Sequence, residues 1–265
     1  MKKFKFYMRI YIKILVQDIK SKMSYREDFF ISVIGIIFTN LAGFISFGII
    51  FENFPSLGGW NYYEMLFFYG FSLVAITPMQ CLFDNNWNLR GYIYTGDFIK
   101  YCFRPLNLFF YYISEIFDIK GLGQLVFGVI MLQYSWIHLE LGFDFITVIE
   151  LLICLPTASL FMIAIMNLAA ATNFFILNSG YVMVTVFKFT DYVRYPNNIY
   201  NNVIKNFFRY IVPIAFVSYF PSRVFLTPDD IPPIVYVSPI LGMLFFYISY
   251  RAWMFGASRY AGTGS

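Results

Sequence analysis

Long apolar stretches separated by short polar ones run through most of the chain, and this pattern predicts helices that cross a membrane. The expected spans are at 29–51, 62–83, 119–137, 145–169, 172–189 and 234–253. The first stretch contains no charged residue, and it is longer than the roughly 20 residues that a helix needs to cross a bilayer. The fold class predicted from this pattern is an all-α membrane protein with six transmembrane helices.

The segment 1–28 is amphipathic rather than uniformly apolar. Its apolar residues recur at spacings of three and four, and Lys and Arg fill much of the other face. That periodicity predicts a helix lying in the membrane interface. No apolar segment directly follows its charges and no small-residue cleavage site precedes the first span, so we do not expect a signal peptide.

The stretch 191–230 does not fit a simple span. Its apolar piece, 211–220, is too short to cross a bilayer and contains Pro213 near its start, with Pro221 directly after it. A short apolar piece bounded by prolines predicts a re-entrant hairpin, at 205–225, on the outer side before the last span. We expect its gate to be formed by Pro213, Phe216, Tyr219 and Pro221.

The polar loop at 90–105, between the second and third spans, has the residues of a short protruding helix. Gly96 permits a sharp turn, and Asp97 is placed to cap a following helix of about two turns. Pro105 would end that helix. Its apolar face would consist of Phe98, Tyr101 and Cys102.

Composition and charge agree with a membrane protein and orient it. Hydrophobic residues make up 59% of the 265 and charged residues only 13%, whereas soluble domains carry about 25% charged residues. Eight of the 19 Lys and Arg precede residue 29, which predicts that the N-terminus is cytoplasmic. With six spans both termini lie in the cytoplasm, and we expect the protein in the inner (cytoplasmic) membrane. Because this basic arm adjoins a bilayer span, we expect no nucleic-acid partner. The six-span arrangement leaves Arg194, Lys205, Arg209 and Arg223 outside, against the positive-inside rule.

The residues needed for catalysis or for cofactor binding are scarce. There is one histidine, His138, and the three cysteines are widely spaced, so we expect no metal site and no catalytic residues. No P-loop sequence occurs, so the chain should bind no nucleotide. Glu115, Asp118 and Lys120 form either a proton relay or interfacial ion pairs, and the interfacial role fits their position beside a span.

Several local patterns occur together in order along the chain. They are Tyr63-Glu64 with Tyr69-Gly70, the run 96–106, Arg194-Tyr195-Pro196 with the segments 211–216 and 219–221, and the tail 259–265. Together they resemble the ABC-2 type permeases, the small six-span membrane subunits of bacterial ABC exporters. The resemblance implies a second permease chain, the same or a sister, and a dimeric ABC ATPase that carries ATP and Mg. It also implies an ATPase-coupling role for Gly96, Asp97, Lys100, Tyr101, Arg104 and Pro105.

These features favour a permease subunit that exports an amphiphile, such as a drug, a lipid-like compound or an antimicrobial peptide. The alternatives are an ATP-independent secondary transporter or channel subunit, and a membrane-embedded enzyme acting on lipid. The enzyme alternative is not supported, because the sequence contains no cluster of His, Asp or Glu residues that could form an active site. An ATPase gene beside this one would favour export over both alternatives.

Overall fold

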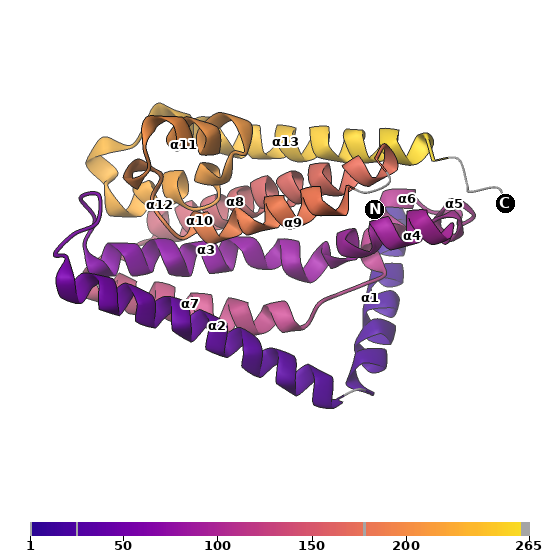
Figure 1. The fold of residues 1–265 in the computed structure, drawn as a ribbon, viewed down its shortest axis with the longest axis horizontal. Coiled ribbons are helices and arrows are strands. Elements are labelled where there is room, and N and C mark those ends of the chain that lie inside the picture. The colour runs from indigo at the N-terminus through magenta and orange to yellow at the C-terminus, as the bar shows by residue number, and fades with distance from the viewer. Residues whose placement is uncertain (1, 25, 177–178, 261–265) are drawn as a thin grey trace.

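The computed structural model describes residues 2–24, 26–176 and 179–260, and most of this part of the chain is helical (Figure 1). The long helices are α1 (Lys2–Met23), α2 (Arg26–Asn53), α3 (Tyr62–Leu82), α7 (Lys120–His138), α8 (Phe145–Ala171) and α13 (Pro233–Ser258). The short ones are α4 (Leu89–Thr95), α5 (Ile99–Cys102), α6 (Leu108–Ser114), α9 (Gly180–Lys188), α10 (Thr190–Val193), α11 (Asn202–Asn206) and α12 (Tyr219–Leu226). Helix α1 runs across the direction of the other long helices, at one end of the bundle.

The amphipathic helix α1 is held to the loop that precedes α7. Lys22 Nζ forms an ion pair with Asp18 at 2.8 Å and also donates to the carbonyl oxygen of Phe117 at 2.7 Å. The Phe117 amide donates in turn to Asp18 Oδ2 at 3.0 Å. Nearer the start of α1, the Tyr7 ring packs edge-on against Phe110 at 4.8 Å. The helix is therefore fastened at both ends to the segment that contains α6.

Four helical segments of the described chain are long and apolar enough to cross a membrane. They are Phe30–Asn53, Tyr62–Leu82, Phe145–Phe174 and Pro233–Ser258. They coincide with four of the six spans predicted from the sequence. The predicted third span coincides with α7, which is long enough at 19 residues but less apolar than these four segments. The chain is thus an all-helical membrane protein, and the six-span arrangement stays a prediction.

The predicted fifth span, 172–189, is not one helix. A single 3-10 turn covers Thr172–Phe174, and α9 begins only at Gly180. Polar side chains stabilise this turn: Asn173 Nδ2 donates to the Ala170 carbonyl at 2.9 Å, and Ser179 Oγ donates to Asn173 Oδ1 at 2.8 Å. The predicted start of this span was wrong because these local hydrogen bonds compete with a continuous helix.

Helix α3 is the centre of the bundle, and 78% of an apolar 18-residue stretch of this helix is buried inside the protein. A reciprocal capping box starts it: Asn61 accepts from the Glu64 amide, and Glu64 accepts from the Asn61 amide. Farther along, α3 crosses α7 at Gly70 and Gly128. A Cβ added at Gly70 would lie 2.6 Å from the backbone nitrogen of Leu132, so only glycine permits this approach.

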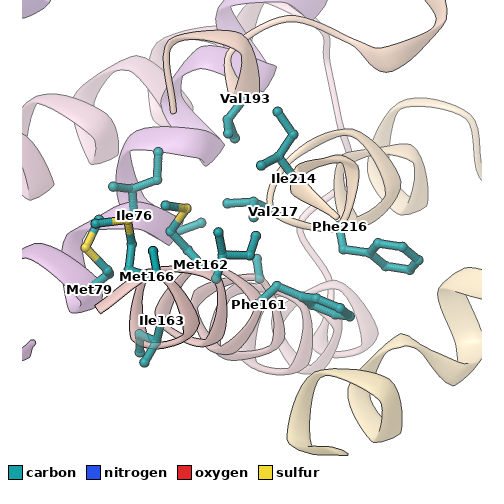
Figure 2. Close-up of a cluster of buried hydrophobic side chains, with 14 of the residues drawn as sticks. Ile76, Met79, Phe161, Met162, Ile163, Met166, Val193, Ile214, Phe216 and Val217 are labelled. Atoms are coloured by element: carbon teal, nitrogen blue, oxygen red, sulfur yellow. The ribbon is translucent and has the colours of Figure 1, made fainter. Parts of the chain in front are cut away.

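The hydrophobic core lies where α3 and α8 meet the segment 190–217. Figure 2 shows the side chains of Met162 and Met166 on α8 beside those of Ile76 and Met79 on α3. Val193, Ile214 and Val217 approach the same cluster from the other side. Long-range burial of this kind fixes the position of the irregular segment 190–217 relative to the spans, although that segment forms no long helix itself.

Candidate functional site

The segment 90–105, expected to couple to an ATPase and called the coupling segment below, forms α4, a turn and α5 at the same end of the bundle as α1 (Figure 1). Gly96 closes α4 in the left-handed conformation with φ of 83°, which is the sharp turn expected from its sequence. The next helix, α5, has only one turn, and its N-cap is Phe98 without a side-chain hydrogen bond. Asp97 therefore does not cap a two-turn helix. Its carboxylate accepts from the Thr95 hydroxyl at 2.7 Å instead.

Phe98 anchors the coupling segment in the bundle. Its ring is fully buried and lies 5.2 Å from the ring of Phe174 and 6.0 Å from that of Trp253. The Tyr260 ring lies 5.0 Å away, and the Tyr260 hydroxyl donates to the Gly96 carbonyl at 3.2 Å. The predicted apolar face is thus only partly correct, because Phe98 and Tyr101 are buried and Cys102 is exposed.

A polar cluster ties α5 to the end of α6. Lys100 Nζ forms an ion pair with Glu115 Oε1 at 3.0 Å, and the Tyr101 hydroxyl donates to Glu115 Oε2. Burial lowers the pKa of Lys100, but the hydrogen bond and negative charge of Glu115 leave it above its ordinary value. Burial and the hydrogen bond to Glu115 both raise the pKa of Tyr101, so its hydroxyl stays a proton donor. Glu115 thus forms an ion pair with Lys100, as the interfacial role expected from the sequence requires, rather than a pair with Lys120.

The outward surface of the coupling segment combines apolar and cationic groups. Phe103 is 78% exposed and Tyr94 is 77% exposed. Arg104 is also exposed, with its guanidinium 5.9 Å from the centre of the Tyr111 ring. Pro105 follows α5 and is exposed as well. Exposed aromatic rings beside an Arg are typical of residues that dominate protein–protein contacts.

Buried asparagines connect this segment to the spans. Asn85 Nδ2 donates to the Tyr112 carbonyl at 2.6 Å, and the Tyr112 hydroxyl donates back to the Asn85 carbonyl at 2.5 Å. Its neighbour Asn86 donates to Asn167 Oδ1 of α8 at 2.6 Å. These bonds join α6 and α8 to the turn that follows α3.

The predicted outer gate lies near the opposite end of the bundle. The π-helix η4 (Phe207–Ile211) follows α11 directly, and this helical run bends by 76° into the run Ile214–Leu226, with Pro213 at the break. Phe216 is buried and stacks on Phe161 of α8 at 4.7 Å. The Ser218 hydroxyl donates to the Phe68 carbonyl of α3 at 3.1 Å, which holds the following Tyr219 against the Phe68 ring. Such a bend is compatible with either a broken span or a re-entrant loop.

The prolines of this gate have different positions. Pro213 lies between the two helical runs, as expected from its sequence. Pro221 was expected to bound the apolar piece, but it lies in the first turn of α12 and is buried there. That position suits proline because a first-turn amide has no intrahelical partner. The structure thus brings Phe216, Tyr219 and Pro221 onto one side of the break, against α3 and α8.

Comparison with protein families decides the class. A family model described as ABC-2 family transporter protein matches residues 37–264. The chain belongs to the ABC-2 transporter family. Searches of curated proteins and of solved structures found no match. Members of this family are membrane transport components that generally are not catalytic themselves and typically work with an ATPase partner.

The sequence analysis of this ABC-2 transporter did not identify several residues that connect the coupling segment to the bundle. Asn85 and Asn86 follow the second apolar run immediately, and that abrupt change from apolar to amide side chains was the available signal. Asn167 lies inside a predicted span, and its pairing with Asn86 depends on how α8 packs beside the end of α3. Glu115 was noticed, but its pairing with Lys100 and Tyr101 depends on the chain reversal between α5 and α6 and has no local signature.

Proposed function

We propose that this chain is the transmembrane permease subunit of an ATP-driven exporter that moves an amphiphilic substrate outward. In this proposal two permease chains and a dimeric ABC ATPase form the transporter, and ATP and Mg are bound by the ATPase. The permease has six spans with both termini in the cytoplasm, and 205–225 is a re-entrant element at the outer gate. Family membership supports the transport role, and the bend at Pro213 is compatible with the re-entrant element.

The single observation that carries the ATP-driven proposal is the construction of the coupling segment. The sequence contains no P-loop, so the work of ATP hydrolysis has to reach this chain through a mechanical contact. A useful contact needs an exposed docking surface on a firmly held support. Phe103 and Arg104 provide the exposed surface, while Phe98 and the cluster around Glu115 hold the backbone behind them.

The test is the charge reversal Arg104→Glu in the purified complex. We expect the variant to insert normally but to lose ATPase subunits during purification, or to keep them with uncoupled turnover, because an acidic ATPase cleft would repel the new carboxylate. Lys205→Glu is the matched control, since Lys205 lies in α11 near the other end of the bundle. Normal ATPase retention and turnover in Arg104→Glu would defeat the coupling assignment.

Transport itself separates export from the ATP-independent alternative. The complex is reconstituted in proteoliposomes with a fluorescent amphiphile, and its movement is measured with ATP, with a non-hydrolysable analogue and without nucleotide. Directional movement only with ATP is the expected result. Equal movement under all three conditions would assign the chain to a channel or secondary transporter instead.

A further inference from the structure

A cavity of about 260 Å³ with several polar side chains in its lining lies between the long helices, outside the coupling segment. Residues of α2, α3, α7, α9 and α10 form its walls. Its polar lining includes Thr39, Asn40, Tyr69, Gln80, Gln124 and Arg194. Neither the apolar periodicity nor the sequence patterns indicated that these groups would meet.

The cavity lies beside two candidate spans, well inside their ends. The Arg194 guanidinium is 5.7 Å from the centre of the Tyr69 ring and lies beside Gly43, where an added Cβ would approach Nη1 to 3.3 Å. Gly43 and Tyr69 are about 10–15 Å inside their helices from the ends at Asn53 and Tyr62, at about 1.5 Å per residue. The six-span arrangement was expected to leave Arg194 outside the membrane, and the structure places its guanidinium beside two candidate spans. Ionisable residues at such depth are expensive and usually mark a substrate pathway.

A second observation points to a ligand. Asn40 is only 6% exposed, and among the described residues its Nδ2 has no hydrogen-bond partner. The backbone carbonyl of the same residue is already occupied, because the Tyr69 hydroxyl donates to it at 3.0 Å. A buried amide group that donates to nothing destabilises the protein unless a bound molecule accepts from it.

The remaining donors and the charge of the cavity define the chemistry of that molecule. Arg194 donates through Nε and Nη2 to the backbone carbonyl and the carboxylate of Asp191, at 3.0 and 2.9 Å, and neither bond uses Nη1. Since Asp191 already neutralises Arg194, a charged ligand would enter a region of low dielectric constant without a counter-charge. The cavity therefore favours an uncharged group that offers acceptor oxygens, such as an amide or ester carbonyl.

Size and the apolar walls define the rest of the ligand. Ile36, Leu73, Ile76 and Phe187 complete the lining with apolar side chains. The volume is below the roughly 300–1,000 Å³ of pockets that enclose a whole drug-sized ligand. It suits a head group and the first methylenes of a chain, while the remainder stays in the lipid.

We propose that this cavity binds the head group of an uncharged amphiphile, with its carbonyl oxygen accepting from Asn40 Nδ2 and Arg194 Nη1. The binding site is independent of the proposed ATP coupling, although its use as an export site rests on the proposed function. It also narrows the expected substrate class from amphiphiles in general to uncharged amide- or ester-bearing ones.

The test compares three probes with the same chain and different heads: tritiated oleamide, oleate and oleylamine. Binding to the complex of permease and ATPase in nanodiscs is measured for wild type, Asn40→Leu and the control Asn53→Leu. Asn53 lies on the same helix but is exposed at its end, with Nδ2 donating to the Ile49 carbonyl. We expect saturable oleamide binding that Asn40→Leu weakens at least tenfold and Asn53→Leu leaves unchanged. Equal oleamide affinity in the wild type and both variants, or tighter binding of oleate than of oleamide, would overturn the proposal.

A measurement on the wild type guards against a variant that fails to fold. Oleamide carrying a diazirine near its head is photolysed in the same nanodiscs, and labelled peptides are identified by mass spectrometry. Labelling of peptides from the wall helices α2, α3, α7, α9 or α10 is expected, and labelling confined to other helices contradicts the site. Retention of the ATPase is measured in the same samples. Intact oleamide binding with a failed coupling test, and a failed binding test with intact coupling, are therefore distinguishable.

Discussion

Replacement of Asp84 by Asn should stabilise the protein in a pH-dependent way. Asp84 lies just beyond the end of α3, and it is partly buried there. Burial, followed by the negative charge of Asp118, raises the pKa of its carboxyl to about 6, against the opposing effects of Lys22 and Lys120. The ionised carboxylate is therefore less stable in the folded protein than in the unfolded chain.

The size of the effect follows from the difference between this pKa and the ordinary value of 3.8. That difference corresponds to about 3 kcal/mol of unfolding free energy. Because the folded pKa is the higher one, the contribution to stability is fully present below about pH 4 and is lost as the pH rises through 6. Asn keeps the size and carries no charge, so Asp84→Asn should recover up to about 3 kcal/mol at pH 8.

Thermal unfolding in detergent, followed by intrinsic tryptophan fluorescence, measures this difference. At roughly 2–4 °C per kcal/mol, the midpoint of Asp84→Asn should lie about 6–12 °C above wild type at pH 8, and most of that gap should vanish at pH 4. Asp229→Asn is the control, since Asp229 is exposed in the turn Pro228–Asp230. A midpoint unchanged at pH 8, or raised equally at both pH values, would refute the reasoning.

Three further outcomes are expected. Gly70→Ala should destabilise the protein by ~1–3 kcal/mol, because the new methyl group meets backbone atoms of α7; Gly91→Ala, with nothing within 4 Å, is its control in detergent melting. Pro213→Ala should reduce export while ATPase retention stays normal, and full export would show that the break needs no proline. With the native cysteines removed, an impermeant maleimide should label Leu57→Cys but not Lys5→Cys in intact cells, and the opposite result would invert the topology.

The apolar pattern was a good guide to the elements whose surroundings are uniform. A helix in lipid has to satisfy its own backbone, so an uncharged run such as 29–51 predicts a helix whatever packs against it. The same reasoning misplaced the start of α9, because side-chain bonds of Asn173 and Ser179 decide that turn. It also could not place Arg194, whose position beside Tyr69 depends on the space left by Gly43 on a distant helix.

The coupling segment shows a similar limit at shorter range. Gly96 acts through its own backbone conformation, so the sharp turn there could be expected from the sequence. Pro105 was expected to end the next helix, but α5 already ends at Cys102. Asp97 had the right residue type for a cap, but the neighbouring Thr95 hydroxyl occupies its carboxylate. The pairing of Glu115 with Tyr101 depends on how the chain folds back between them, and a linear pattern does not contain that information.

The unequal burial of the spans sets an order in which they should exchange backbone hydrogens with solvent. Only 11% of an apolar 18-residue stretch of α2 is buried inside the protein, against 78% for α3. Helix α2 therefore depends on lipid or on another chain for most of its contacts. Stripping lipid from the purified protein should therefore accelerate deuterium uptake in α2 long before α3 responds. Lipid retained through purification would then be part of what keeps the wall formed by Asn40 in place.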